Sequence, residues 1–471
     1  MNVVDMHCAI ISRLANNEEC DLNQNNYHGD IEKLRQGEYL LQNFAMIVPL
    51  EKFDNPKKEV FYLIIRYLPK LSQALRSHYY DETSITKIFH QNVLRVYETI
   101  LKQGKKMKDY KIFVINPGST STKLSLFVNE ENKYTCDVFH DSSVLKTFAN
   151  INNQLNYRMQ VVEQFIQDNQ IDLSNLDAIA SRGGPCYPLE SGTYLVDDQL
   201  IEDTKLSKGG LYHASMLGVQ MAKCLQQKYG GIIYMSDPTV VDEYCDLARI
   251  TGIEGIYRKS ISHALNLKVV ARKYASSIKR KYEDLNLIVA HIDGGITITA
   301  HDHGKMIDGN DGGGGDGPFT PTRMGSMAVT DVIEYLWDKP KQEVLNLCSC
   351  TGGLSNYFGT SNADTIHAQL GNDTKAMRIW QAMIYQICKS IGSMSCVLKG
   401  KVDGIVLTGG LMRFDDVYQM IDSHCGWIAP ITVYPGEYEQ EALALNALAI
   451  LKGEVDAKHY KGKPIWKGFN D

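Results

Sequence analysis

Residues 111–127 read KIFVINPGSTSTKLSLF and place a run of small polar residues between two apolar segments. The apolar segments, 112–115 and 124–128, have the length and the β-branched content of strands. The second strand distinguishes the stretch from a Walker loop, which a helix follows. The sequence therefore predicts a hairpin whose turn has an unusual density of polar groups.

The turn carries the groups that a phosphate-binding loop needs. Gly118 allows the backbone to approach a ligand closely, and Ser119 and Ser121 offer hydroxyl and amide donors. Asn116 and Lys123 flank the turn and add an amide and a positive charge. Because Asn, Pro, Gly and Ser are also ordinary turn formers, a plain hairpin turn remains the alternative for this stretch taken alone.

A second hairpin of the same kind follows about 175 residues later. Residues 287–302, LIVAHIDGGITITAHD, again give an apolar strand, a short Gly-containing turn and an alternating strand. This echo favours two related halves that face each other, although two unrelated hairpins would give the same pattern. The second turn contributes His291, Asp293, Gly294 and Gly295 as candidate ligand-binding residues.

Composition limits the possible functions. The chain has 471 residues, enough for two or three domains, with 44% hydrophobic and 22% charged residues. A net charge of −6 and dispersed Lys and Arg argue against a nucleic-acid partner. We expect no membrane span and no signal peptide, and the 11 cysteines show no zinc-type spacing. Reduced thiols and a cytoplasmic location are therefore expected.

Residues 1–107 differ from the rest of the chain. They contain few glycines and no phosphate-type loop, and residues 81–106 have the apolar periodicity, cap residues and terminal charges of an amphipathic helix. Residues 59–75 predict another helix, kinked near Pro69. We interpret 1–107 as a small α-helical extension whose role the sequence does not reveal.

From residue 108 onward, strands alternate with helices, which is typical of an α/β fold. The expected strands are 112–115, 124–128, 178–180, 232–235, 287–290, 296–300, 405–407 and 431–434, and the expected helices include 214–229, 262–282 and 373–398. A third Gly-containing turn, Gly409–Gly410, follows one of these strands. Three such turns in one α/β chain are better explained by a nucleotide that spans several loops than by chance.

Isolated charged residues lie near predicted strand and helix ends. Arg182 and Asp237 each end a strand, His213 and His263 precede helices, and Arg323 follows a Gly-rich run. A single His or Arg of this kind is more often structural than functional. The recurrence of such residues favours a functional role, because open α/β sheets bind ligands at strand ends.

Taken together, these segments resemble butyrate kinase, of the short-chain carboxylate kinase group that includes acetate kinase. The resemblance covers residues 108–460, in order: VINPGSTSTKLSLF, SRGGP, DPTVVDE, SHALNLKVVARKYA, DLNLIVAHIDGG, GPFTPTRMG, and IVLTGGL with VYPGE. It implies two actin-like, ribonuclease H-like domains of the acetate kinase, sugar kinase, chaperone and actin superfamily. We expect them at 108–265 and 266–460, with the C-terminal helix packing back on the first.

The resemblance also implies roles for individual residues. Catalysis is assigned to Arg182, His213, Asp237, His263 and Arg323, with the two arginines holding the carboxylate and the phosphoryl group. ATP binding is assigned to Asn116, Gly118, Ser119, Ser121, Lys123, His291, Asp293, Gly294, Gly295, Gly409 and Gly410. Mg²⁺ is assigned to Asp237 and Glu437, with Glu439 as a competing choice.

The implied reaction is phosphorylation of butanoate by ATP to give butanoyl phosphate and ADP. This reaction needs no general base, because a carboxylate is already ionised at neutral pH. Its catalysis therefore depends mainly on positioning the two reactants and on stabilising the charge of the transferring phosphoryl group. Propionate, acetate or a branched-chain acid are alternative substrates. A homodimer or a larger homo-oligomer is implied by the family alone.

The sequence departs from the family at several places. Asp293 stands where a Gly is usual, Met216 stands where an Asn is expected, and family members usually begin near Met107. A carboxylate at Asp293 would repel nucleotide phosphates unless a cation intervenes, or it would ligate the metal itself. A catalytically weakened nucleotide-binding scaffold is therefore a further alternative, although the presence of both arginines and His263 favours an active enzyme.

Overall fold

The structure is a computed structural model that describes residues 3–8, 39–44, 108–119 and 121–469. Its contacts divide the chain into two units, Met1–Lys108 and Asp109–Asp471. In the first unit, β1 (Val3–Cys8) and β2 (Tyr39–Phe44) form a parallel pair that the sequence did not lead us to expect. The helices predicted at 59–75 and 81–106 lie outside the described residues.

The first sheet of the second unit starts from the opening hairpin. Its antiparallel meander is β3 (Lys111–Pro117), β4 (Ser121–Val128) and β5 (Glu131–Phe139). Two strands then extend the sheet from β3 in parallel, first β6 (Ala178–Arg182) and then β8 (Ile232–Ser236). The far edge is completed by β7 (Thr193–Leu195) and β14 (Lys458–His459).

The second sheet repeats this topology. An antiparallel meander again comes first and two parallel strands follow: β9 (Asn286–Ile292), β10 (Ile296–Asp302), β11 (Lys305–Gly309), β12 (Gly404–Gly409) and β13 (Ile431–Pro435). The order β11-β10-β9-β12-β13 matches β5-β4-β3-β6-β8 strand for strand. The two similar hairpins in the sequence are therefore β3–β4 and β9–β10, at equivalent places in two related sheets.

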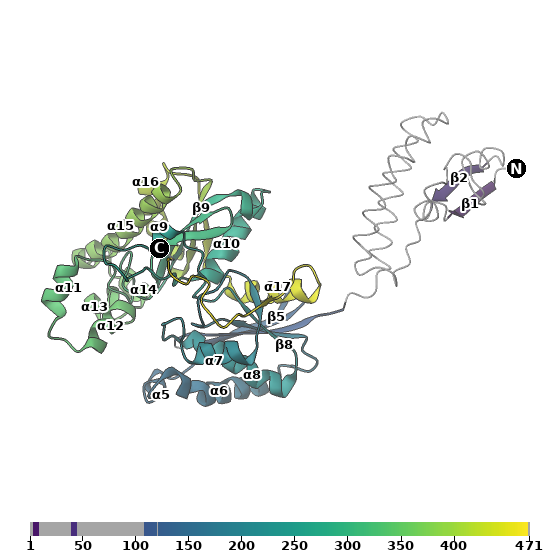
Figure 1. The fold of residues 1–471 in the computed structure, drawn as a ribbon, viewed down its shortest axis with the longest axis horizontal. Helices are drawn as coiled ribbons and strands as arrows, with labels where there is room; N and C mark the ends of the chain where they lie inside the picture. The colour runs from purple at the N-terminus through teal and green to yellow at the C-terminus, as the bar shows by residue number, and fades with distance from the viewer. Residues whose placement is uncertain (1–2, 9–38, 45–107, 120, 470–471) are drawn as a thin grey trace. The chain divides into compact units, whose positions relative to one another are not determined.

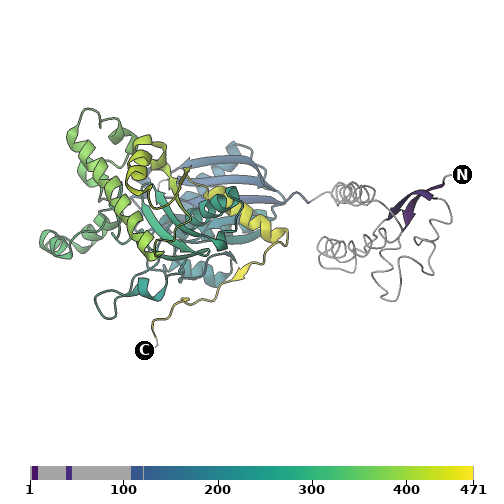
Figure 2. The ribbon, with the colours of Figure 1, turned by 90° about the horizontal axis from the view of Figure 1, so that it is seen from above.

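Helices cover both sheets and lie between them (Figures 1 and 2). One side of the first sheet packs against α6 (Leu155–Asp168) and α8 (Gly218–Tyr229), and the second sheet packs against α15 (Thr374–Val397) and α16 (Asp415–Cys425). Two further helices contact each other, α10 (Ala264–Ser277) on the second sheet and α17 (Glu439–Leu451) on the first. The C-terminal helix thus joins the sheet formed by the start of the unit.

Short helices occupy the connections. They are α5 (Ser142–Leu145), η2 (Ile151–Gln154), α7 (Asp198–Lys205), η3 (Ala214–Leu217), α9 (Asp246–Arg249), η4 (Tyr282–Asp284), α11 (Val329–Leu336), α12 (Lys341–Ser349), α13 (Leu354–Phe358), α14 (Ala363–His367) and η5 (Gly410–Arg413).

The secondary-structure prediction matches the fold closely. All eight predicted strands are present. The helix expected at 262–282 is shorter, because α10 ends at Ser277 and Lys279 adopts a left-handed φ of 55°. The domain boundary expected at residue 265 falls within the first turn of α10 and stays a prediction, since the contacts do not divide 109–471 further.

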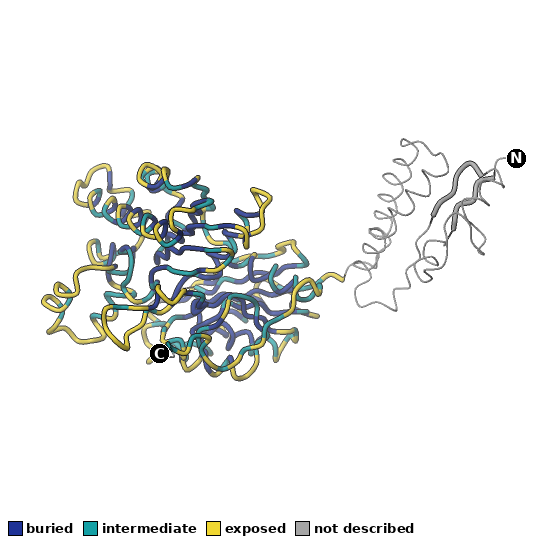
Figure 3. Tube along the Cα trace, turned by 45° about the horizontal axis from the view of Figure 1, so that its top comes forward, coloured by how far each residue is buried: buried dark blue, intermediate teal, exposed yellow. Residues whose placement is uncertain are grey.

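The central strands are buried on both faces, as Figure 3 shows by the dark interior of the tube. Their apolar residues are almost fully enclosed because helices lie on both sides, which explains why the strands read as continuous apolar runs rather than alternating ones. Within the described residues no helix is long and apolar enough to cross a membrane. The nine cysteines between residues 109 and 469 are free thiols.

Candidate functional site

The β3–β4 turn is held from behind by a buried arginine. Gly118 donates its N–H to the carbonyl of Ser121 at 2.7 Å and closes the turn. From α6, Arg158 donates to the carbonyls of Gly118 at 2.9 Å and Ser119 at 3.0 Å, and its side chain is 1% exposed. This contact adds positive charge behind the turn and occupies carbonyl oxygens that would repel phosphate. The sequence analysis missed Arg158, whose one signal is a charge on the buried face of an amphipathic helix.

Glu439 is the buried first residue of α17, and its side chain connects this helix to the first sheet. Its Oε2 accepts from Asn116 Nδ2 at 2.7 Å and lies 3.2 Å from Arg182 Nη1. Only 2% of Glu439 is exposed, so these two partners replace the water that its carboxylate loses on burial. Asn116 and Arg182 were both predicted site residues, and the structure brings them together on this glutamate.

Glu437, two residues earlier, has a different environment. Its carboxylate forms an ion pair with Lys123 of β4. Burial alone would raise the pKa of the Glu437 carboxyl, but the Lys123 ammonium outweighs it and the pKa lies below the ordinary value. Glu437 is therefore ionised at neutral pH and available as an oxygen ligand, which separates it from the competing candidate Glu439.

The β9–β10 turn and the end of β12 lie against each other. Asp293 accepts the N–H of Gly294 at 2.7 Å through one carboxylate oxygen and the N–H of Gly410 at 2.8 Å through the other. Gly409 has a φ of 103°, and a Cβ at that position would lie 2.3 Å from the carbonyl oxygen of Ile292. Only glycine therefore permits this approach, and two of the turns predicted to bind ATP become neighbours.

Asn266 fixes the orientation and tautomer of His291. The Asn266 amide nitrogen donates to His291 Nδ1 at 2.9 Å and to Thr408 Oγ1 at 3.2 Å, while its oxygen accepts the N–H of Tyr438 at 3.0 Å. The Tyr438 donor settles which end of the amide faces His291, so Nδ1 accepts and Nε2 carries the proton. Burial lowers the pKa of His291, which keeps the ring neutral. Sequence reasoning missed Asn266, three residues after His263.

Two more histidines are neutral donors in the same region. His263 stacks on His291 with ring centroids 4.1 Å apart, and its Nδ1 lies 3.0 Å from Thr297 Oγ1. His213 Nδ1 accepts the N–H of Ser215 at 3.1 Å, which leaves its proton on Nε2. Burial, and then the arginines nearby, lower the pKa of His213 to about 3. Burial, and then His291 and the arginines, hold the pKa of His263 well below its ordinary value.

Arg323 lies directly against the β9–β10 turn. A Cβ on Gly295 would lie 1.8 Å from Arg323 Nη1, so the absence of a side chain at Gly295 makes room for the guanidinium. Thr320 and Thr322 donate to the carbonyl of Gly294 at 2.8 and 2.9 Å and tie the Arg323 segment to the turn. Arg323 Nε and Nη1 are buried with no partner among the described residues, which suits an anion at this place.

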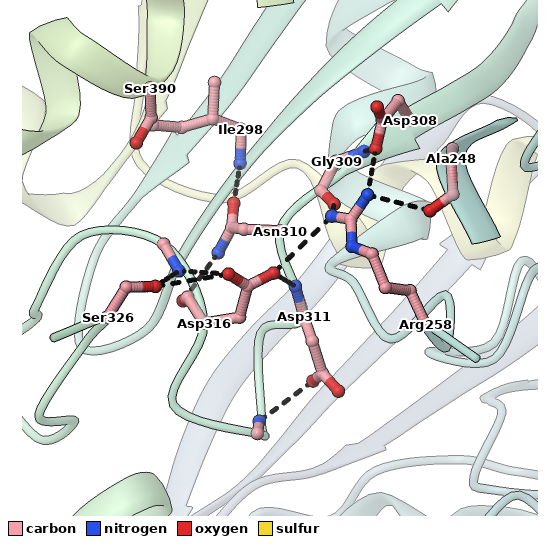
Figure 4. A network of polar contacts seen from close by, with 12 residues as sticks. Ala248, Arg258, Ile298, Asp308, Gly309, Asn310, Asp311, Asp316, Ser326 and Ser390 are labelled. Carbon is pink, nitrogen blue, oxygen red and sulfur yellow. Dashed lines mark hydrogen bonds and ion pairs between the residues drawn. The ribbon is translucent and has the colours of Figure 1, made fainter. Parts of the chain in front are cut away.

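The Gly-rich run before Arg323 is an ordered polar network (Figure 4). Asp311 accepts the N–H groups of residues 313 and 314, and Asp316 accepts that of Asp311 at 3.1 Å. Asn310 donates to a β10 carbonyl at 2.9 Å, and Arg258 pairs with Asp308 at 2.8 Å. The run is therefore anchored to β10 and positions the Arg323 segment, although its composition alone suggests a loose loop.

Asp237 does not join the other acidic residues. Its Oδ1 accepts from Ser191 Oγ and from the N–H of Gly192, both at 2.7 Å, and its Oδ2 lies 3.8 Å from Arg272. Its φ of 36° is unusual for a residue with a side chain. The assignment of Asp237 to Mg²⁺ stays a prediction.

One group of side chains could hold a cation. His291, Asp293 and Glu437 place ligand-type atoms within 4.8 Å of one another. Because His291 Nδ1 is occupied by Asn266 and Nε2 carries the proton, the carboxylates of Asp293 and Glu437 are the donors that fit a hard cation such as Mg²⁺.

The comparisons with known proteins agree with this architecture. The Acetokinase family model matches residues 249–415. Butyrate kinase 2 of Clostridium acetobutylicum is 41% identical over 355 residues, which cover 75% of this chain and 99% of that protein. The chain belongs to the acetokinase family. A probable butyrate kinase of Clostridium botulinum is 40% identical, with 74% of this chain and 99% of that protein covered.

Solved structures of this family share the fold. A propionate kinase from Francisella tularensis gives a TM-score of 0.58 at 18% identity and covers 72% of this chain and 98% of its own. An acetate kinase from Porphyromonas gingivalis gives 0.57 at 16% identity and covers 73% and 100%. The two related sheets are thus the two actin-like domains of an acetokinase-family phosphotransferase that uses ATP.

Proposed function

We propose that this acetokinase-family enzyme phosphorylates butanoate with ATP to give butanoyl phosphate and ADP. The 41% identity to a butyrate kinase over nearly the whole of that relative supports butanoate as the substrate. The observation that carries the catalytic assignment is the group formed by Arg182, Arg323, His213 and His263. Both arginines lower the pKa of His213 and of His263, which supports grouping the four side chains in one site.

These residues suit a reaction between two anions. The arginine guanidinium binds planar carboxylate and phosphoryl oxygens through paired donors, and Arg323 has buried donors without a partner among the described residues. The buried histidines are neutral and therefore donate hydrogen bonds without adding or removing a proton. Since the substrate carboxylate is already ionised, its oxygen attacks the γ-phosphorus directly and ADP leaves in line.

Nucleotide binding is assigned to the turns at the strand ends. The Gly118 turn and the Gly294–Gly295 turn occupy equivalent places in the two sheets, and both have carbonyls held by side chains behind them. We propose that they bind the ATP phosphates, with Lys123 and His291 as donors. Glu437 and Asp293 would hold Mg²⁺, which would offset the charge of the ATP phosphates.

Location and assembly rest on the family resemblance. We propose that the enzyme works in the cytoplasm as a homodimer or a larger homo-oligomer. Sedimentation velocity of the full chain tests the assembly, and a single species of about 53 kDa would refute it.

The decisive test is formation of acyl hydroxamate from butanoate, Mg-ATP and hydroxylamine. We expect turnover with butanoate, and competition with propionate, acetate and isobutyrate measures acid preference. Arg323→Ala should lower kcat/KM by about 100-fold or more, because it removes a donor aimed at the developing charge. Absence of hydroxamate from all four acids would refute the proposal, and near-normal activity of Arg323→Ala would remove that residue from the site.

A further inference from the structure

We propose that Asp293 is a tethered anion that makes nucleotide binding depend on prior binding of a divalent cation. Without the cation, its carboxylate occupies backbone donors of the two nucleotide turns. With the cation, the carboxylate turns to the metal, which it shares with Glu437, and the donors become free for the nucleotide. The inference rests on the proposed nucleotide site and specifies the order in which that site is filled.

The Asp293 carboxylate contacts two of the turns assigned to ATP. Its two carboxylate oxygens accept N–H groups from two different turns, Gly294 at 2.7 Å and Gly410 at 2.8 Å. Both N–H groups belong to the turns assigned to ATP. An acidic side chain with one oxygen on each turn occupies one backbone donor in each of two turns that ATP would use. Nucleotide and Asp293 therefore compete for the same donors.

The basic side chains near this region pair with carboxylates other than Asp293. Lys123 forms its ion pair with Glu437, and Arg182 forms its ion pair with Glu439. Asp293 itself has no ion pair among the described residues, so no cationic side chain offsets its carboxylate beside the place where several phosphate charges enter. Like charges at short range in a partly buried site are strongly unfavourable.

A divalent cation removes both the competition for backbone donors and the repulsion between the carboxylate and the phosphates. The carboxylate oxygens of Asp293 and Glu437 lie within 4.8 Å of each other and of a ring nitrogen of His291. Two carboxylates and several waters are a sufficient ligand set for Mg²⁺ or Mn²⁺.

The test separates cation binding from catalysis. Mn²⁺ binding to the nucleotide-free protein is followed by the loss of the free-ion electron paramagnetic resonance signal. ATP binding is measured by calorimetry with EDTA and again with saturating Mg²⁺. The variants are Asp293→Asn, which keeps the shape and removes the charge, and Asp293→Gly, which also frees the donors. Asp168→Asn removes one exposed carboxylate at the end of α6 and serves as the matched control.

The wild-type protein and Asp168→Asn should bind one Mn²⁺ without nucleotide, and both Asp293 variants should bind it at least tenfold more weakly. In EDTA, Asp293→Gly should bind ATP at least tenfold more tightly than the wild type, with Asp293→Asn between them. Unchanged Mn²⁺ affinity, or unchanged metal-free ATP affinity in Asp293→Gly, overturns the proposal. Because neither readout needs turnover, a protein without carboxylate kinase activity still gives a clear result.

Discussion

Gly295→Ala provides a sharp test of how the site is built. The added Cβ would lie 1.8 Å from Arg323 Nη1 and 2.5 Å from Arg323 Cζ, distances that no non-bonded pair sustains. The guanidinium must therefore retreat by more than about 1 Å, a misplacement that typically costs on the order of 100-fold in rate. We expect kcat/KM for butanoate to fall by about 100-fold, which is about 2.7 kcal/mol of transition-state stabilisation.

Stability should change little in the same variant. The group that must move is the end of a side chain rather than backbone, and the φ of Gly295 is not in the positive region. The assays are hydroxamate kinetics and thermal unfolding. Gly294→Ala is the comparison within the turn, because the space around its Cβ is open, and it should lose clearly less activity. Gly371→Ala adds a methyl to an exposed position and should match the wild type.

The reasoning fails if Gly295→Ala keeps kcat/KM within threefold of the Gly294→Ala value. It also fails if Gly295→Ala unfolds well below the wild-type temperature, since the conflict would then involve backbone. A crystal structure of the variant would show directly whether the guanidinium has moved.

Three further outcomes follow from the same structure. Gly409→Ala should destabilise the fold by about 2–3 kcal/mol, because φ is 103° and the Cβ meets the Ile292 carbonyl at 2.3 Å; an unchanged urea midpoint would contradict this. Asn266→Ala should lower kcat by at least about tenfold and introduce a new inflection in the pH–rate profile as His291 loses its fixed tautomer, whereas a purely structural role would leave that profile unmoved. Burial lowers the pKa of His213 to about 3 and holds that of His301 well below normal, so below pH 6.5 the unfolded chain gains protons that the folded chain does not. Between pH 7 and pH 5 the free energy of unfolding should fall by about 2 kcal/mol through His213 and further through His301, and the total loss should be smaller in His301→Gln.

The sequence predicted the elements well because strong local patterns specify them. The hairpin at 111–127 and its echo at 287–302 are marked by apolar runs around Gly-containing turns, and both are present as β3–β4 and β9–β10. The weaker predictions depended on context. The end of α10 was misjudged because Lys279 takes a left-handed φ, a choice that no helix-breaking residue announces.

The site residues likewise divide into those that a local pattern indicates and those that only tertiary contacts reveal. Arg182, His263 and Arg323 stood out as charges near element ends, but Arg158 and Asn266 did not, because each acts on a turn or ring far from it along the chain. Similarly, the sequence offered Glu437 and Glu439 as equivalent candidates. The structure separates them, since Glu439 is enclosed by Asn116 and Arg182 while Glu437 lies beside His291 and Asp293.

By itself, the sequence determined the α/β class, the duplicated hairpins and the types of chemical group available, since these depend on local pattern and residue identity. Tertiary structure decided which groups meet. Asp293 shows why: the sequence identifies a carboxylate in a phosphate-type turn, but its consequence depends on the Gly410 N–H, 117 residues away. Contacts over such separations arise from the packing of β9 beside β12, which no local pattern encodes.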